Sequence, residues 1–184
     1  PPGVLTIDDN WHEAYGSLRF HPGRFPRPRE TIDRLHELGF KVMLWVSPFV
    51  SPDSATFRAL ERAGYLVRAH DGTIAIRQWW NGHSAVLDCS NDACVAWLHE
   101  QLDRLVRDEG VDGFKFDGGD VAFYRPHDRT SRPTNPTGQC AAWAAVGLRY
   151  GLNEYRASWK GAGLPLAQRL KDKRQRWGDD GLAS

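Results

Sequence analysis

The sequence predicts an α/β protein with a parallel sheet. Short apolar runs that end at polar or glycine residues alternate with stretches that place apolar residues at helical spacing. This alternation favours strand–helix units around a parallel sheet. The 184 residues are fewer than the roughly 250 that a closed eight-stranded barrel needs. We therefore expect a partial (β/α)8 TIM barrel, truncated at both ends, with residues 1–184 as one segment of a barrel domain.

Four segments are expected to be strands of this sheet. The run Lys-Val-Met-Leu-Trp-Val at 41–46 is the clearest, because Ser47-Pro48 halts it. The others are residues 4–7, 111–117 and 164–170. An open, doubly wound sheet is the alternative, although no glycine-rich phosphate loop follows any of these strands.

Amphipathic segments predict helices at 28–38, 53–64, 91–108 and 140–150. Asp53 is expected to cap the second helix, which Gly64 ends, and Asn91 or Ser90 is expected to cap the third.

The stretch 64–82 departs from this alternation. Strand-like pieces at 65–67 and 73–76 flank the Asp71-Gly72 turn, which predicts a small hairpin. We expect the hairpin to be inserted into a loop of the barrel domain.

Composition narrows the classes of function. The net charge is +1 with both signs interspersed, so no electrostatic footprint for nucleic acid or an anionic membrane is expected. No apolar run approaches the roughly 20 residues that cross a bilayer. The cysteines Cys89, Cys94 and Cys140 lack metal-ligand spacing and are expected to be buried thiols. No cofactor or metal is expected, and the compartment stays open, with a secreted or periplasmic location compatible with the sequence.

The segment 113–120 carries the first candidate site. Because side chains alternate along a strand, Phe114 and Phe116 should face the helices, while Lys115 and Asp117 face the barrel interior. Charged groups there are costly to bury unless they are paired or used, and barrel enzymes place catalytic groups at the carboxyl ends of strands. The alternative is a structural Lys–Asp ion pair in a turn.

A second cluster follows the first strand. Carboxylates accept hydrogen bonds from sugar hydroxyls and an indole covers the apolar face of a sugar ring, so Asp8, Asp9 and Trp11 are candidate substrate contacts. Trp45 at the end of the next strand and Trp80 in a Trp-Trp-Asn-Gly loop add aromatic surface. The alternatives are a loop-stabilising Asp pair and tryptophans that belong to the core.

A third cluster lies near the end of the chain. A glycosidase needs a second carboxyl group that donates a proton to the leaving oxygen. Asp179 or Asp180, downstream of Arg169, is the candidate. The alternative is a solvated charged turn.

In these motifs the chain resembles glycoside hydrolase family 31, and the resemblance covers nearly its whole length. The segment Phe-Lys-Phe-Asp-Gly-Gly-Asp at 114–120 is similar to the family's nucleophile strand. This resemblance implies that Asp117 is the nucleophile and Asp120 a supporting carboxylate. An ungapped reading of the first loop places the family's sugar-binding Asp at Asp8, with Asp9 adjacent.

Two further motifs extend this resemblance. Residues 41–48 are similar to the family's Leu-Trp-x-x-Pro strand, which implies that Trp45 contributes to the wall of the sugar pocket. Arg169 falls where the family has an Arg near the sugar hydroxyls.

The acid/base motif of the family, Trp-x-Gly-Asp, resembles Trp177-Gly178-Asp179-Asp180. Counting from Trp177 selects Asp180, which we favour, whereas the position directly after Gly178 selects Asp179. Trp177 then joins the substrate contacts.

The Asp-Asp-Asn-Trp segment is also similar to the Asp-Asp-x-Trp of α-galactosidase families 27 and 36, whose paired acids hold the axial-hydroxyl side of galactose. The resemblance therefore implies a retaining α-glycoside hydrolase that cleaves terminal α-linked sugars by double displacement, with α-galactosides favoured. Alternatives within the family are α-glucosides and α-xylosides. Lys115 is expected to hydrogen-bond sugar hydroxyls and to support the charge of Asp117.

Two other classes of protein stay open. A non-catalytic carbohydrate-binding barrel would keep Asp8 and Asp9 without needing a second catalytic carboxyl group. A metal-dependent enzyme would use Asp117 and Asp120 as hard oxygen ligands. The expected partner is an oligosaccharide or glycoside, with no nucleic acid or membrane, and the oligomeric state is open.

Overall fold

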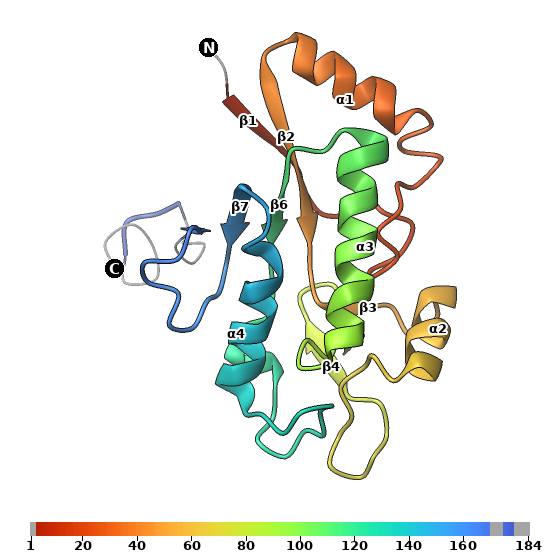
Figure 1. Ribbon diagram of the computed structural model, residues 1–184, viewed down its shortest axis with the longest axis vertical. Helices are drawn as coiled ribbons and strands as arrows, with labels where there is room; N and C mark the ends of the chain where they lie inside the picture. The colour runs from red at the N-terminus through yellow and green to blue at the C-terminus, as the bar shows by residue number, and fades with distance from the viewer. Residues whose placement is uncertain (1–2, 170–174, 179–184) are drawn as a thin grey trace.

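The computed structural model describes residues 3–169 and 175–178. Its main sheet is parallel throughout, and neighbouring strands are hydrogen-bonded to each other (Figure 1). The strands, in their order across the sheet, are β1 (Gly3–Ile7), β2 (Phe40–Val46), β6 (Gly113–Phe116), β7 (Leu152–Tyr155) and β8 (Ala167–Gln168). This order follows the chain, as barrel strands do, and confirms a partial TIM barrel rather than a doubly wound sheet.

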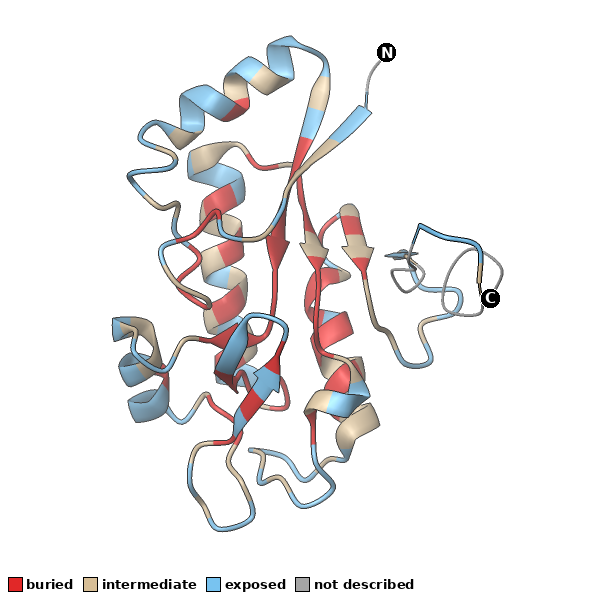
Figure 2. Cartoon of the chain, turned by 180° about the vertical axis from the view of Figure 1, so that it is seen from behind, coloured by how far each residue is buried: buried red, intermediate tan, exposed pale blue. Residues whose placement is uncertain are grey.

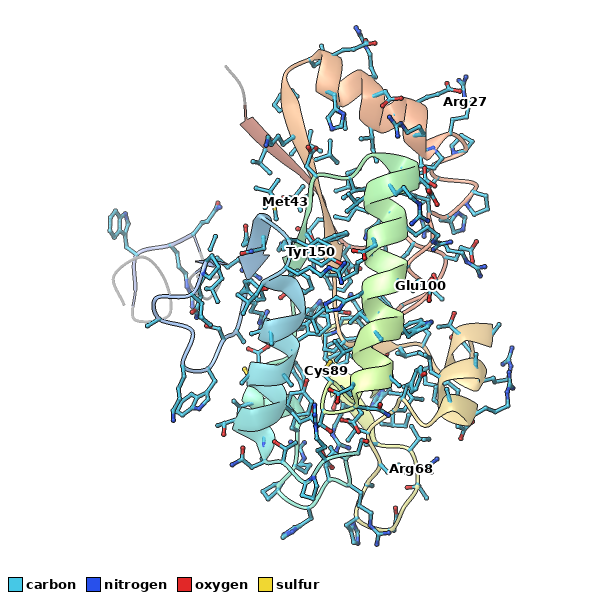
Figure 3. All side chains as sticks on the ribbon, in the orientation of Figure 1. Arg27, Met43, Arg68, Cys89, Glu100 and Tyr150 are labelled. Carbon is cyan, nitrogen blue, oxygen red and sulfur yellow. The ribbon has the colours of Figure 1, made fainter. Side chains whose placement is uncertain are left out.

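Helices cover one face of this sheet (Figure 1). They are α1 (Pro28–Glu37), α3 (Asp92–Glu109) and α4 (Pro136–Gly147). Seen from behind, the buried residues run along the middle strands and along the sides of the helices that face them (Figure 2). The core lies in this layer, where Phe114 contacts Tyr150 and Phe116 contacts Trp143. Figure 3 shows the side chains that fill it around Tyr150 and Cys89.

Local signals set the ends of the helices. Asn91 caps α3 by accepting the backbone N–H groups of Ala93 and Cys94, and Gly110 ends it in the left-handed conformation. The shorter helix α2 (Ala55–Ala63) is capped by Ser54, whose side chain accepts a hydrogen bond from the backbone N–H of Phe57. The expected Asp53 cap is therefore wrong by one residue.

Two elements near the C-terminus differ from expectation. Helix α4 begins at Pro136 because Asn135 caps it, four residues before the predicted start. Strand β7 was not predicted, because its sequence Leu-Asn-Glu-Tyr is short and half polar. Among the described residues of the predicted strand 164–170, Ala167–Gln168 alone are paired as a strand.

A small antiparallel sheet follows β2. It consists of β3 (Phe49–Val50), β5 (Gly82–Val86) and β4 (Ile76–Trp79). The expected pairing of 65–67 with 73–76 is reduced to a single bridge from Arg68 to Ile74, and the paired hairpin lies further along the chain, around the Trp80-Asn81 turn.

All three cysteines are free and buried, as expected. Burial raises the pKa of the Cys94 thiol to about 12 and that of Cys140 to about 11, so both are neutral at physiological pH. Among the described helices, none is both long and apolar enough to cross a membrane.

Close packing at the end of α4 gives a stability prediction. A methyl group at Gly147 would lie 2.1 Å from the Tyr155 hydroxyl oxygen and 2.3 Å from the Phe116 ring. Alanine gains up to about 1 kcal/mol over glycine in a helix, but overpacking costs about 1–3 kcal/mol, and both neighbours are fully buried. We expect Gly147→Ala to lower the unfolding midpoint measured by thermal denaturation.

The control is Gly151→Ala, because nothing lies within 4 Å of a methyl group at that position. Equal midpoints for the two variants would contradict this packing.

Candidate active site

The carboxyl ends of the parallel strands bring charged side chains from distant parts of the sequence together. Each of β1, β6, β7 and β8 is followed within a few residues by an acid or a base. Because parallel strands end at the same edge of a sheet, these groups share one mouth. The residues in question are Asp8 and Asp9 after β1, Asp117 and Asp120 after β6, Arg156 after β7 and Arg169 after β8.

Asp117 occupies the centre of this edge and is 6% exposed. Its Oδ2 accepts the indole N–H of Trp45 at 2.8 Å, and its Oδ1 accepts the backbone N–H of Gly118 at 2.9 Å. A guanidinium nitrogen of Arg169 donates to Oδ1 at 3.3 Å. These donors hold the carboxylate in one orientation, with Lys115 beside it on the same strand.

The chain turns sharply after Asp117. Gly118 and Gly119 have φ angles of +67° and +70°, and a methyl group at Gly119 would lie 2.2 Å from the Trp143 ring. Only glycine meets both requirements, so the pair keeps the backbone close to α4 and leaves Asp117 at the mouth.

Asp120, three residues after Asp117, pairs with Arg156. The Arg156 Nε lies 3.1 Å from Asp120 Oδ2 and 3.8 Å from Asp117 Oδ1. The Trp80 ring lies over this guanidinium, 4.7 Å from its carbon, which is a cation–π contact. Sequence reasoning missed Arg156 because it missed β7, and recognising Leu-Asn-Glu-Tyr as a strand would have revealed an Arg at its carboxyl end.

The two acids after β1 have different partners. Asp8 accepts a hydrogen bond from the Lys115 ammonium at 2.6 Å. The Lys115 side chain therefore lies on the same face of the sheet as Asp117, and its charge is paired with Asp8. Asp9 accepts the Tyr15 hydroxyl at 3.0 Å and the side-chain amide of Asn81. Tyr15 and Asn81 were not among the predicted site residues.

Of the four tryptophans predicted to contact substrate, two are buried and two are exposed. Trp11 and Trp45 are each 1% exposed, so the prediction that their rings offer an open sugar platform is wrong. The Trp11 indole donates to the carbonyl of Trp45, and Trp45 reaches the site only through its N–H. Trp80 is 45% exposed at the mouth, and Trp177 is 84% exposed.

The predicted proton donors Asp179 and Asp180 lie outside the described residues. Arg169, expected near the sugar hydroxyls, contacts Asp117 and also lies 3.3 Å from Glu154. Within the described part of the chain, no group of three His, Cys, Asp or Glu side chains is arranged to hold a metal ion.

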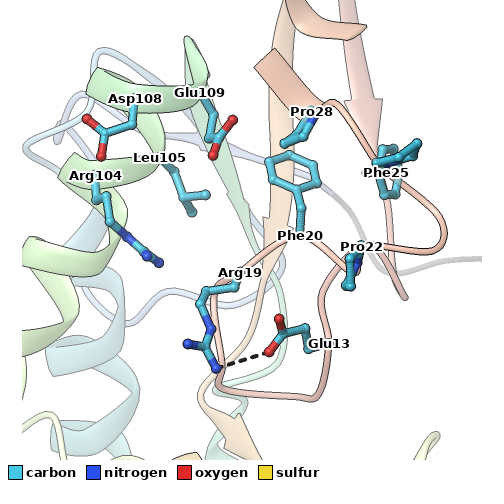
Figure 4. A pocket seen from close by; sticks show the side chains of 11 residues that line it. Glu13, Arg19, Phe20, Pro22, Phe25, Pro28, Arg104, Leu105, Asp108 and Glu109 are labelled. Carbon is cyan, nitrogen blue, oxygen red and sulfur yellow. Dashed lines mark hydrogen bonds and ion pairs between the residues drawn. The ribbon is translucent and has the colours of Figure 1, made fainter. Parts of the chain in front are cut away.

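A cavity of about 320 Å³ lies away from this mouth (Figure 4). It is lined by the loop before α1 and by the last turns of α3, including Phe20, Arg104 and Leu105, with Arg19 paired to Glu13. None of the site carboxylates named above lines it.

His12 is buried among aromatic rings. Its ring stacks on Trp11 and meets Tyr15 edge-on, and its Nδ1 is buried without a hydrogen-bond partner among the described residues. Burial, aided by Arg24 and opposed by Asp9, lowers the pKa of His12 to about 4. The imidazole is therefore neutral at physiological pH.

Residues 1–176 match the model of a protein family described as the glycosyl hydrolases family 31 TIM-barrel domain. The chain therefore belongs to glycosyl hydrolase family 31, as the motifs at Asp117 and Asp8 indicated.

Among sequence relatives, the chain is 36% identical to the myogenesis-regulating glycosidase of Mus musculus, over 98% of this chain and 26% of that protein. It is 30% identical to the α-xylosidase XylQ of Lactiplantibacillus pentosus, over 67% of this chain and 17% of that protein. The chain thus spans 26% and 17% of the length of these two relatives.

Solved structures share the fold. A family 31 α-xylosidase from a soil metagenome, complexed with xylose, superposes with a TM-score of 0.78 at 20% identity, over 92% of this chain and 27% of that one. The cycloalternan-degrading enzyme of Trueperella pyogenes gives 0.73 at 26% identity, over 88% and 28%.

The buried imidazole predicts a pH dependence of stability. The unfolded chain binds a proton at His12 below its ordinary pKa of about 6.5, whereas the folded chain does so only near 4. The unfolded state therefore gains a proton at His12 as pH falls from 6.5 to 4, and the free energy of unfolding decreases by up to about 3 kcal/mol. We expect His12→Phe to flatten the fall of unfolding free energy in this window, measured by urea denaturation.

His70→Gln is the matched control, because His70 is exposed. An unchanged slope in His12→Phe, or an equal change in both variants, would show that His12 is not the group responsible.

Proposed function

We propose that this chain forms the catalytic edge of a retaining α-glycoside hydrolase that cleaves terminal α-linked sugars. The observation that carries the proposal is the placement of Asp117: it lies at the carboxyl end of a barrel strand, oriented by Trp45 and Gly118. Lys115, paired with Asp8, faces the same side. A fixed carboxylate beside hydroxyl-binding groups is what a glycosidic nucleophile requires.

In the proposed mechanism, Asp117 attacks the anomeric carbon as the bond to the leaving oxygen breaks. Asp180, or Asp179, gives that oxygen a proton. The same acid then takes a proton from water, whose oxygen attacks the anomeric carbon and releases Asp117. Retaining enzymes hold the two carboxyl groups about 5–5.5 Å apart. The cycloalternan-degrading enzyme of T. pyogenes has also been solved in complex with a covalent intermediate, which supports this mechanism.

The substrate sugar is the finer part of the proposal. Several relatives carry the names α-xylosidase, α-glucosidase and 1,3-α-isomaltosidase, which supports the α-glycoside class. We favour α-galactosides because the adjacent acids Asp8 and Asp9 resemble the pair that holds the axial-hydroxyl side of galactose. In this chain both acids lie at the mouth and are held by separate partners.

The nucleophile is tested with Asp117→Ala and azide. We expect turnover of a p-nitrophenyl α-glycoside to fall by at least about a thousandfold, because the covalent step is lost. Azide should restore part of the activity by attacking the anomeric carbon from the vacated side, which gives a β-glycosyl azide detectable by NMR.

Asp71→Ala, in an exposed turn, serves as the control and should keep full activity. Wild-type turnover by Asp117→Ala would reject Asp117 as the nucleophile. A mechanism-based cyclitol that binds without labelling Asp117 would favour a non-catalytic carbohydrate-binding protein.

The indole of Trp45 gives a second test of the same carboxylate. Trp45→Phe keeps the buried ring but removes the hydrogen bond to Asp117 Oδ2. Hydrogen bonds to charged groups contribute about 1.5–3 kcal/mol, so we expect kcat to fall about ten- to a hundredfold in steady-state assays.

Trp143→Phe is the matched control, because Trp143 is equally buried and its indole N–H has no hydrogen-bond partner among the described residues. If both variants lose activity to the same extent, the Trp45–Asp117 hydrogen bond does not contribute.

The sugar is tested with p-nitrophenyl α-galactoside, α-glucoside and α-xyloside. The largest kcat/KM is expected for the galactoside. A larger value for either of the others would leave the hydrolase assignment standing and overturn the sugar preference.

A further inference from the structure

The tip of the β4–β5 hairpin reaches both sides of the carboxylate edge. Trp80 lies over the guanidinium of Arg156, which follows β7. The next residue, Asn81, donates its side-chain amide to Oδ2 of Asp9, which follows β1, at 2.5 Å. A turn of two residues thus contacts groups from the first and the fourth strand of the sheet.

Neutral donors hold both oxygens of Asp9. Its Oδ1 accepts the Tyr15 hydroxyl at 3.0 Å and the backbone N–H of Asn10 at 2.7 Å, while Asn81 donates to Oδ2. Burial and then the charge of Asp9 raise the pKa of Tyr15 above its ordinary value, so its hydroxyl remains a donor. Asp8, in contrast, is paired with the charged Lys115.

The residues that precede the exposed Asn81 on the hairpin are anchored by buried contacts. The Trp79 indole donates to the Ser84 hydroxyl at 3.0 Å, and its buried ring stacks on Phe49 with centroids 4.3 Å apart. On the same strand, Arg77 forms a nearly fully buried ion pair with Asp128. Support of this kind is what a side chain needs to hold another group within a few tenths of an ångström.

We propose that Asn81 is a positioning residue that determines sugar specificity through Asp9. A carboxylate oxygen accepts more than one hydrogen bond, so Asp9 Oδ2 can still accept a sugar hydroxyl while the Asn81 amide fixes its direction. A sugar whose hydroxyl points elsewhere leaves this oxygen without its second donor and is rejected. The inference rests on the proposed hydrolase function and adds a specificity determinant outside the acids themselves.

The test compares Asn81→Ala with wild type on p-nitrophenyl α-galactoside and α-glucoside, two epimers. We expect kcat/KM for the preferred epimer to fall about tenfold, and the ratio between the epimers to fall at least about fivefold, with the loss mainly in KM. Gln78→Ala is the control, because Gln78 is exposed on β4 of the same hairpin and should change neither value.

A second variant, Asn81→Asp, separates positioning from a general effect on the hairpin. It places a carboxylate against Asp9, and two adjacent carboxylates share a proton only at low pH. In Asn81→Asp, the ratio of the kcat/KM values for the two epimers should therefore be lower than in wild type near pH 7 and recover below about pH 5. In Gln78→Ala this ratio should not vary with pH.

Equal loss on both epimers, or an unchanged ratio in both Asn81 variants, would overturn the role of Asn81 while leaving the hydrolase intact. Failure of the proposed function is a different result: the wild type turns over neither glycoside. In that case the affinities of the same variants for galactose and glucose are measured by calorimetry. The ratio of the two affinities then tests the role of Asn81 in place of the kcat/KM ratio.

Discussion

The alternation of side chains along β6 is the constraint on which the site depends. Phe114 and Phe116 are fully buried against the helical layer, and a one-residue slip of the strand would exchange the faces of all its side chains. Lys115 and Asp117 are therefore directed to the opposite face. The register places Trp45 and Glu154 beside Lys115 on the neighbouring strands, so the packing of the helices determines which charged groups meet.

The parts of the fold that could be predicted are those whose local pattern and packing agree. The buried run of β2 and the capped, glycine-ended α3 carry their own signals. Strand β7 carries almost none, because four residues with two polar side chains become a strand only through pairing with β6. The hairpin pairing was misplaced for a similar reason: the Asp71-Gly72 turn is a strong local signal, but the buried Trp79 pairs the later residues.

The site shows the same division. Asp117, Lys115 and Asp8 could be predicted because each stands directly at the end of a recognisable strand. Arg156 and Asn81 could not, since their positions depend on a weak strand and on a hairpin whose register the sequence leaves open. The roles of the buried tryptophans were misassigned because an indole at the end of a strand is equally compatible with a core position and with a sugar contact. Only the three-dimensional packing distinguishes the two.

The contacts at the mouth also define its charge. Three cations described there are each paired with an acid: Lys115 with Asp8, Arg156 with Asp120, and Arg169 with Asp117 and Glu154. Asp9 is held by neutral donors alone among the contacts of the described residues, so the acids named here outnumber the cations named here. Glycoside cleavage passes through an oxocarbenium-like transition state with positive charge near the anomeric carbon. An excess of fixed carboxylates stabilises that charge more than it stabilises a neutral ground-state sugar, and this difference is what lowers a barrier. The neutral donors on Asp9 therefore have a second consequence: they orient this acid without cancelling its charge.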